Sequence, residues 1–243
     1  MKIYLAGSGW NKICWENYNF YDFYRLESFV YIKGEEKNIS KYKSFLLDSG
    51  AFTFMNKNNG VVDWDDYIVK YANFINTYSV DNFFELDIDS IVGIKEVERL
   101  RYKLESLTNK QSIPVWHKSR GLDYWKDMIK KYKYVAIGGI VTKEIKASQH
   151  NIFITLLDLA KKQGCKVHGL GFTNLEGLKK YKFYSVDSTS WLSGNRFGSV
   201  YWFNGQTMKK QNKKTGQRVI TKKTAINNFN EWVKYSKYAE HNL

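Results

Sequence analysis

Cysteine, proline and long apolar runs are all scarce in this chain of 243 residues. Its two cysteines, Cys14 and Cys165, have no spacing typical of a disulfide framework or of a four-ligand zinc site. The single proline, Pro114, excludes a proline-rich linker, and no glycine-serine tract or internal repeat divides the chain. We therefore expect reduced thiols, no metal or other cofactor, and a single domain over residues 1–243.

Apolar runs are too short for a secretory leader or a membrane span. The segment Met1–Leu5 runs directly into Gly7 and Gly9, and nowhere do about 18 apolar residues follow one another. We expect a soluble, cytoplasmic protein without a membrane partner.

Acidic residues are also in the minority. Thirty-eight Lys and Arg stand against 24 Asp and Glu, which gives a formal charge of +14. Such an excess favours a polyanionic partner such as nucleic acid, because lysine and arginine release counterions from phosphates on binding. High lysine content is also a common bias of AT-rich genomes, so charge alone leaves nucleic-acid binding open.

The chain does contain short apolar runs that alternate with amphipathic stretches. The 43% apolar residues suffice for a large core. The alternation predicts βα units with a parallel sheet, most simply a (β/α)8 TIM barrel, with a doubly wound sheet as the alternative. The expected strands are residues 2–6, 44–49, 83–89, 113–118, 134–140, 166–171, 183–188 and, less clearly, 198–203. The expected helices are residues 64–79, 92–108, 121–132, 143–163, 174–180 and 224–240. Residues 10–43 read as an irregular first crossover and residues 204–223 as a basic insertion.

Polar residues end most of these expected strands. In a parallel barrel the carboxyl ends of all strands open on one face, so these residues should converge. Each has a structural explanation of its own, such as helix capping, ion pairing with lysine, or a tight turn, but their joint placement favours a functional cavity. They are Asp48, Glu85, Asp87, Asp89, His117, Gly138, Gly139, His168 and Asp187.

The order of these strand ends resembles the tRNA-guanine transglycosylase superfamily, including its phage and bacterial DNA-modifying relatives. The resemblance covers about residues 44–205, and the ordered set of motifs is what makes it specific. The motifs are Asp48-Ser49-Gly50-Ala51-Phe52, Leu86-Asp87, Ala136-Ile137-Gly138-Gly139-Ile140, His168-Gly169-Leu170-Gly171 and Val186-Asp187. That family is a TIM barrel that exchanges guanine in a polynucleotide for a 7-deazaguanine base through a covalent glycosyl-enzyme intermediate.

The resemblance implies a role for each matching position. Asp187 matches the nucleophile and Asp48 the second catalytic aspartate. Asp87 and Gly139, with Gly138 beside it, match positions that recognise the base, Phe52 matches an aromatic stacking position, and His117 falls where the family usually has glutamine. His168 either lines the base pocket or is a core histidine, and Arg196 lies near arginines that bind phosphates.

Physical chemistry supports these roles. Cleavage of an N-glycosidic bond gives the sugar oxocarbenium character that one carboxylate can capture, while a second carboxyl group moves the proton of the base. A carboxylate such as Asp87 can accept the N1–H and amine of guanine, a backbone N–H such as that of Gly139 can donate to O6, and an aromatic face can stack on the base.

Two departures from the family's sequence pattern bear on which polynucleotide the chain acts on. The family's tRNA enzymes bind zinc through three cysteines and a histidine after the nucleophile strand, and both cysteines here precede Asp187. The chain is also shorter, and the segment after Phe203 carries Lys209, Lys210, Lys213 and Lys214, which form either a solvated loop or a phosphate-binding track. We therefore favour DNA over tRNA as the polynucleotide partner, with a free purine or deazapurine base as the second substrate.

Two other functions fit the same residues. If water replaces the incoming base, the enzyme is a DNA glycosylase that leaves an abasic site. If neither reaction occurs, the chain is a nucleic-acid-binding barrel, which the presence of both Asp48 and Asp187 disfavours.

Overall fold

Seven parallel strands form one curled sheet at the centre of the protein. The computed structural model describes residues 1–7, 21–50, 53, 62–214, 216 and 220–243, and the side chains of residues 195 and 196 lie outside that description. The strands of the sheet are β1 (Lys2–Ala6), β2 (Tyr24–Ser28), β3 (Ser44–Asp48), β4 (Val115–Trp116), β5 (Tyr134–Ile137), β6 (Lys166–Gly169) and β7 (Ser185–Ser188). Their spatial order is β3-β2-β1-β7-β6-β5-β4.

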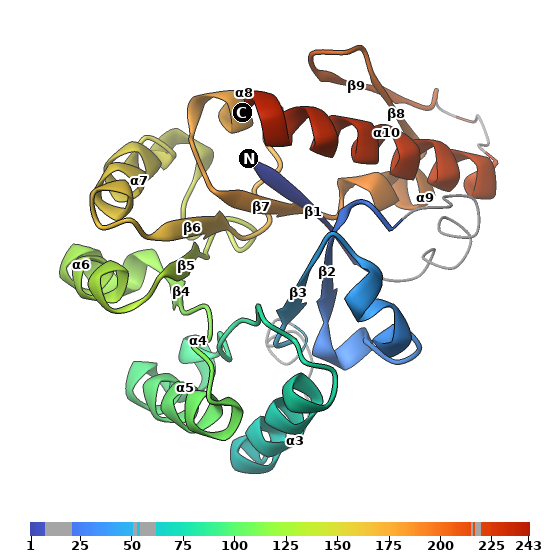
Figure 1. The fold of residues 1–243 in the computed structure, drawn as a ribbon. Coiled ribbons are helices and arrows are strands. Elements are labelled where there is room, and N and C mark those ends of the chain that lie inside the picture. Colours follow the sequence, from blue (N-terminus) through green and yellow to red (C-terminus); the bar gives the residue numbers. More distant parts are fainter. Residues whose placement is uncertain (8–20, 51–52, 54–61, 215, 217–219) are drawn as a thin grey trace.

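The sheet curls around a common axis, which brings its edge strands β3 and β4 toward each other (Figure 1). Residues 82–84 run between these edges. Leu47 forms an isolated parallel bridge with Phe83, and Phe84 forms another with Ile113. The Tyr71 hydroxyl also donates to the carbonyls of Leu47 and Phe84, both at 3.1 Å. The gap in the sheet is therefore spanned by backbone hydrogen bonds without a regular strand.

Helices cover the outer side of the curl (Figure 1). They are α3 (Trp64–Thr77), α4 (Asp89–Val92), α5 (Ile94–Thr108), α6 (Gly121–Lys131), α7 (Ile152–Lys162), α8 (Leu175–Lys180), α9 (Ser193–Phe197) and α10 (Thr221–Asn242). Short 3-10 helices occupy Phe29–Tyr31, Glu36–Lys41, Lys118–Arg120, Ala147–Gln149 and Ser190–Leu192. None of the described helices has both the length and the apolar content that a bilayer crossing requires.

Helix α3 shows why these segments are helical. The Asp63 carboxylate caps its first turn by accepting from the Asp66 N–H at 3.0 Å. Ile68, Tyr71, Ala72 and Ile75 then recur at helical spacing and are all buried. The sequence therefore specifies both the start of the helix and the face that packs on the sheet.

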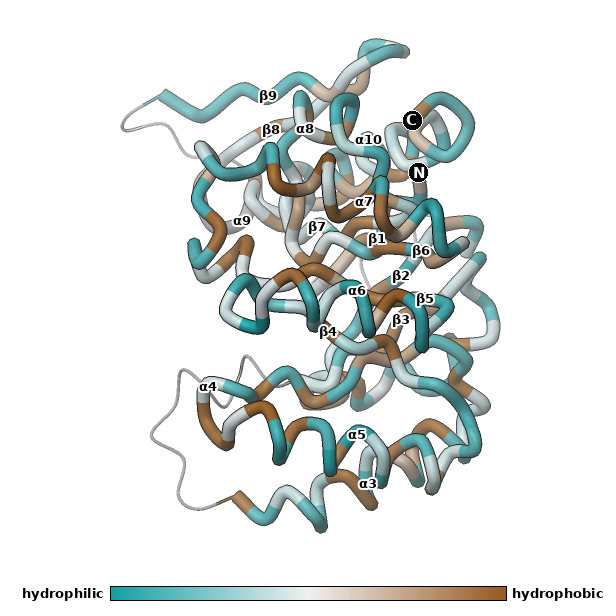
Figure 2. The backbone as a smooth tube through the Cα atoms, turned by 90° about the vertical axis from the view of Figure 1, so that its left-hand side faces the viewer, coloured by the Kyte–Doolittle hydropathy of each residue, from teal (hydrophilic) through white to brown (hydrophobic). Residues whose placement is uncertain are grey.

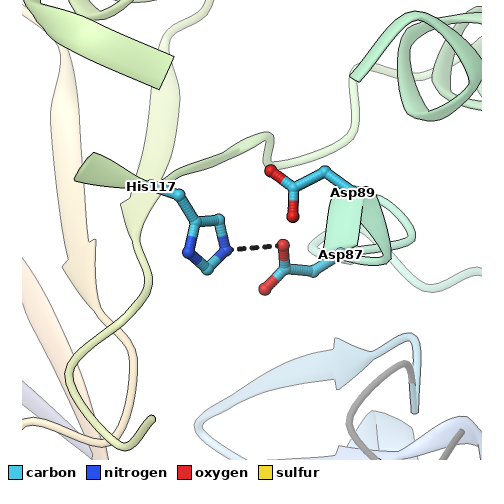
Figure 3. Close-up of side chains that lie close together, drawn as sticks. All are labelled: Asp87, Asp89 and His117. Carbon is cyan, nitrogen blue, oxygen red and sulfur yellow. Dashed lines mark hydrogen bonds and ion pairs between the residues drawn. The ribbon is translucent and has the colours of Figure 1, made fainter. Parts of the chain in front are cut away.

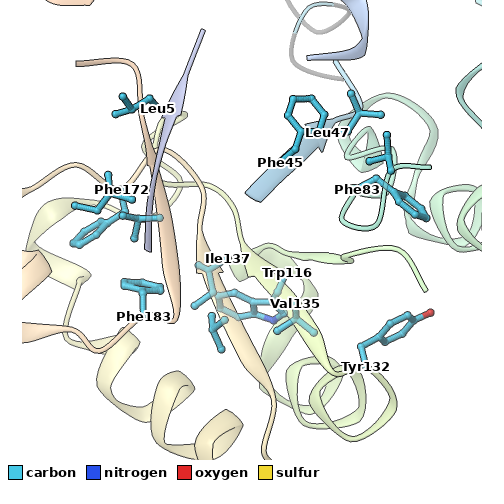
Figure 4. Packing of buried hydrophobic residues seen from close by; sticks show 14 of the residues in the cluster. Leu5, Phe45, Leu47, Phe83, Trp116, Tyr132, Val135, Ile137, Phe172 and Phe183 are labelled. Atoms are coloured by element: carbon cyan, nitrogen blue, oxygen red, sulfur yellow. The ribbon is translucent and has the colours of Figure 1, made fainter. Parts of the chain in front are cut away.

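The two faces of the sheet bury separate sets of side chains. Successive residues of a strand point to opposite faces, so Ile3 and Leu5 pack outward against the helices while Tyr4 and Ala6 point inward. Figure 4 shows residues of the outer layer, among them Leu5, Phe45 and Phe83. The inner cluster consists of Tyr4, Ala6, Tyr24, Leu26, Leu46, Phe84, Ile113, Val115 and Ala136.

A β-hairpin follows α9 and lies outside the parallel sheet. Strand β8 (Ser199–Phe203) pairs antiparallel with β9 (Met208–Asn212), and the pair rests on α10. The Asn228 side chain accepts from the Tyr201 N–H and donates to the Ser199 carbonyl, both at 2.9 Å. In Figure 2, β9 is largely hydrophilic and runs toward the side of the molecule on which α4 and α9 lie.

Three expectations from the sequence need correction. Residues 198–203 do not add an eighth strand to the parallel sheet, because they pair with β9. The supposedly irregular segment 10–43 contains β2, which lies inside the sheet. The expected strand 83–89 is reduced to two isolated bridges. A closed barrel of eight regular strands is therefore not what the sheet forms.

Candidate active site at the carboxyl ends of the strands

Two aspartates extend the inner face of the sheet at its carboxyl end. Asp48 ends β3, two residues after the inner Leu46, and Asp187 lies in β7, two residues after Ser185. Alternation along each strand therefore turns both side chains inward. Because the strands are parallel, both carboxylates lie at the same end of the curled sheet.

Asp187 is 8% exposed, and one of its oxygens is held by two donors. Its Oδ1 accepts from the Gly171 N–H at 2.6 Å and lies 3.2 Å from His168 Nε2. His168 is fully buried, and its Nδ1 lies 2.7 Å from Ser185 Oγ. The segment His168–Gly171 therefore wraps around the Asp187 carboxylate and fixes its orientation.

Asp48 lies in an environment that favours its protonated form. Burial, together with the charges of Asp187, Asp87 and Glu27, raises the pKa of Asp48 to about 7, although the hydrogen bond from the Gly50 N–H opposes the shift. That N–H lies 3.1 Å from Oδ2. Within the described ranges, no lysine or arginine pairs with Asp48 or Asp187. A carboxyl group that titrates near neutral pH is suited to both donating and accepting a proton.

Asp87 lies beside His117, to which it is hydrogen bonded (Figure 3). His117 Nε2 lies 2.7 Å from Asp87 Oδ1, and His117 Nδ1 lies 2.9 Å from Glu144 Oε2. Burial lowers the pKa of His117, but the hydrogen bonds to Asp87 and Glu144 outweigh it and raise the pKa to about 9. His117 is therefore an imidazolium that donates from both nitrogens at neutral pH.

The Arg120 guanidinium joins the remaining acidic residues behind Asp87. It donates from Nε to Asp89 at 3.0 Å and from Nη1 to Glu85 at 3.1 Å, and its Nη2 lies 3.9 Å from Asp87. Glu85 is fully buried, and it also accepts from Arg101 at 2.9 Å and from the Val115 N–H at 2.7 Å. Burial raises the pKa of Glu85, and Arg120 and Arg101 oppose that shift. This network ties α5 and α6 to the segment that carries Asp87.

Asp87, Asp89 and His117 also have the composition of a metal site. One ligand atom from each lies within 4.8 Å of the others. Figure 3 shows the three side chains lying close together. A cation there would have to displace the Nε2 proton that His117 donates to Asp87, and it would meet the positive charge of Arg120. Internal ion pairs therefore account for the cluster, and the absence of a metal stays a prediction.

Gly138 and Gly139 bring the backbone close to these side chains. A Cβ on Gly138 would lie 2.7 Å from His117 Cε1, and one on Gly139 would lie 2.7 Å from Glu144 Oε2. Gly139 also has φ +76°, a conformation that favours glycine. The two glycines therefore let β5 end directly against the Asp87, His117 and Glu144 group.

The other predicted site residues lie apart from this centre or outside the description. Phe52 lies outside the described residues, as does the side chain of Arg196, whose backbone belongs to α9. Lys209, Lys210, Lys213 and Lys214 are exposed on β9 and just after it. A Cβ on Gly198, at the end of α9, would lie 2.5 Å from the Lys213 side chain, which brings that lysine beside α9.

Sequence reasoning missed Arg120, which pairs with Asp89, and Glu144, which holds the His117 ring from the side opposite Asp87. Glu144 falls in the expected helix 143–163, but that helix begins only at Ile152, so Glu144 lies in a connecting segment. Arg120 ends a short 3-10 helix between β4 and α6. The weak signal for Arg120 was its position two residues after the expected strand 113–118.

No model of a known protein family matches this chain, and no curated protein matches it in sequence.

Proposed function

We propose that this protein is an enzyme of the guanine transglycosylase type, which exchanges guanine in DNA for a 7-deazaguanine-type base through a covalent bond from Asp187 to the sugar. The observation that carries the proposal is the convergence of Asp48, Asp87 and Asp187 at one end of the sheet. The charges of Asp87 and Asp187 contribute to the raised pKa of Asp48. The three carboxylates have different partners, which suits them to different tasks.

We also propose that the sheet is a (β/α)8 barrel whose remaining strand is reduced to Phe83 and Phe84. Phe84 N donates to the Leu47 carbonyl at 3.0 Å, and Ile113 N donates to the Phe83 carbonyl at 2.8 Å. These bonds continue the parallel order from β3 to the start of β4. The helices outside and the inner cluster inside are the layers expected of such a barrel.

Asp187 is the group that attacks the sugar. As its Oδ2 bonds to the anomeric carbon, the bond from that carbon to the base nitrogen breaks and the base keeps the electron pair. In the part of the chain that the structure describes, Oδ2 takes no hydrogen bond, whereas Oδ1 takes two. The carboxylate therefore presents one oxygen for attack and uses the other as its anchor.

Asp48 transfers protons. In its protonated form it donates to the departing guanine, and as a carboxylate it then accepts the proton that the incoming base loses. A pKa of about 7 makes both forms accessible at neutral pH. Breaking the bond from Asp187 to the sugar in favour of the new base completes the exchange.

Asp87 and the Gly139 backbone are assigned to reading the base. Guanine and 7-deazaguanine both present N1–H and an exocyclic amine, which a carboxylate accepts, and O6, which a backbone N–H reaches. His117 takes no part in direct readout here, because Asp87 and Glu144 occupy both of its nitrogens. The four hairpin lysines and Arg196 are assigned to the phosphates.

The test is incubation of the protein with duplex DNA, single-stranded DNA or tRNA, with and without radiolabelled guanine or a 7-deazaguanine base. Incorporation of label into DNA is the expected result, and Asp187→Ala is the control that should incorporate none. Abasic sites without incorporation would identify a DNA glycosylase instead. Binding without either product would overturn the enzymatic proposal.

A further inference from the structure

A buried chain of hydrogen bonds leads from Tyr134 to the Asp187 carboxylate. Tyr134 Oη lies 2.5 Å from Ser185 Oγ, which lies 2.7 Å from His168 Nδ1. On the other side of the ring, His168 Nε2 lies 3.2 Å from Asp187 Oδ1. His168 and Ser185 are both fully buried, so the chain runs through the interior of the sheet.

The chain fixes which histidine nitrogen carries the proton. Burial raises the pKa of Tyr134 well above its usual value, so its hydroxyl stays protonated. Among the described residues, Ser185 Oγ is the hydrogen-bond partner of that hydroxyl, and we infer that it accepts from it. Ser185 then donates its own proton to His168 Nδ1. A neutral His168 therefore carries its proton on Nε2 and donates it to Asp187.

The second donor to Asp187 comes from the same loop and depends on a glycine. Gly171 has φ +66°, and a Cβ there would lie 2.2 Å from Val141 Cγ2. Its N–H reaches Asp187 Oδ1 at 2.6 Å. Two donors thus converge on Oδ1, one from a side chain and one from the backbone.

We propose that His168 is a positioning residue that promotes release of Asp187 from the covalent intermediate, an inference that rests on the proposed function. Hydrogen bonds to an ionised carboxylate are stronger than those to a neutral ester. When the incoming base bonds to the anomeric carbon and the bond from that carbon to Oδ2 breaks, the electron pair returns to Asp187. The Nε2–H and the Gly171 N–H stabilise the charge that appears in that step.

The test compares His168→Leu, which removes the donor, with His168→Gln, whose amide N–H replaces Nε2–H. Single-turnover reactions with labelled DNA, followed on denaturing gels, give separate rates for adduct formation and breakdown. For His168→Leu we expect breakdown to slow by roughly 10-fold to 100-fold, the loss expected for a hydrogen bond to a charged group, with the adduct accumulating. His168→Gln should retain most of the wild-type rate.

Ser185→Ala is a milder change to the same hydrogen-bond chain. It removes the donor to Nδ1 without changing the ring, and it should slow breakdown less than His168→Leu. Equal slowing of formation and breakdown in His168→Leu, or an unchanged breakdown rate, would overturn the proposal. Circular dichroism of each variant verifies that it is folded.

Nitrogen NMR of the histidine rings separates this inference from the proposed function. We expect His168, assigned by its loss in His168→Gln, to carry its proton on Nε2 and to shift in Asp187→Asn. A proton on Nδ1 alone would overturn the role of His168 even if the enzyme forms an adduct. A protein that forms no adduct but shows the expected tautomer would overturn the proposed function, and the assigned step with it, while leaving the contact with Asp187 established.

Discussion

The carboxylates at the carboxyl ends of the strands form two groups, and the two groups have different kinds of partner. On one side, Glu85, Asp87, Asp89 and Glu144 are joined to Arg101, Arg120 and a protonated His117. On the other side, Asp48 and Asp187 take backbone and histidine hydrogen bonds, and within the described ranges neither pairs with a lysine or an arginine. We call these the paired side and the unpaired side.

This difference in partners suits the paired side to holding its side chains in fixed positions and the unpaired side to chemical reaction. Neutralised carboxylates keep fixed positions and charges, which suits recognition of a base. Asp48 has no lysine or arginine among its described partners, and burial, together with the charges of neighbouring carboxylates, raises its pKa to about 7.

The largest effect is expected for Asp48→Asn on the unpaired side. Asparagine keeps the size of the side chain but cannot transfer a proton, so turnover should fall by roughly 10²-fold to 10⁴-fold. The pH dependence of turnover near pH 7 should disappear with it. Steady-state kinetics from pH 5 to 9 provide the measurement, and a variant with wild-type turnover would exclude Asp48 as the proton-transfer group.

On the paired side, Glu85→Ala should lower the free energy of unfolding. It leaves Arg101 and Arg120 buried without the carboxylate that both contact, and loss of one partner of a buried ion pair typically costs about 3–5 kcal/mol. Urea unfolding provides the measurement. The matched control is Asp65→Ala, which removes a carboxylate that Arg99 and Lys103 contact at the surface and should have far less effect. Similar losses in both variants would contradict the distinction.

The hairpin lysines lie outside both sides of the site and should affect only binding. Changing Lys209, Lys210, Lys213 and Lys214 to glutamine should flatten the dependence of DNA affinity on salt, by about 0.9 in logarithmic slope for each phosphate that the variant no longer neutralises. The matched control changes Lys161, Lys162, Lys179 and Lys180, at the ends of α7 and α8. An equal change of slope in the control would assign the effect to net charge alone.

The smallest effect concerns the protonation of His117. Because its pKa is raised from 6.5 to about 9 in the folded protein, its contribution to stability is complete below pH 6.5 and is lost as the pH rises through 9. His117→Gln should lack this loss, which we expect to be on the order of 3 kcal/mol. Unfolding at pH 6 and pH 9.5 tests this, with the exposed His241→Gln as the control. A wild type and a His117→Gln variant with parallel pH profiles would refute it.

Much of the fold follows from periodicity, and the exceptions have physical causes. β1, β3, β5, β6 and β7 are apolar runs in the sequence, and each lies within or close to its expected range. β2 was missed because its sequence, Tyr24–Ser28, carries Arg25 and Glu27, which look like loop residues. They are buried because they pair with each other, a contact that no local pattern reveals.

The site was predictable where it depends on strands. Asp48 and Asp187 lie at strand ends, and the carboxyl ends of parallel strands converge whatever connects them. Arg120 and Glu144 depend on the path of connecting segments, so their contacts with Asp87, Asp89 and His117 could not be read from the sequence. β8 was misassigned because an apolar run does not specify its partner, which here is β9.

The most direct test of the account is whether Asp187 bonds to the nucleic acid. Labelled DNA is incubated with wild-type protein, Asp187→Ala and Asp187→Asn, denatured, and resolved on a gel, and the modified residue is located by mass spectrometry. The account predicts an adduct on Asp187 in the wild type and none in either variant, with DNA affinity at fixed salt little changed. Base release by Asp187→Ala at the wild-type rate would contradict it.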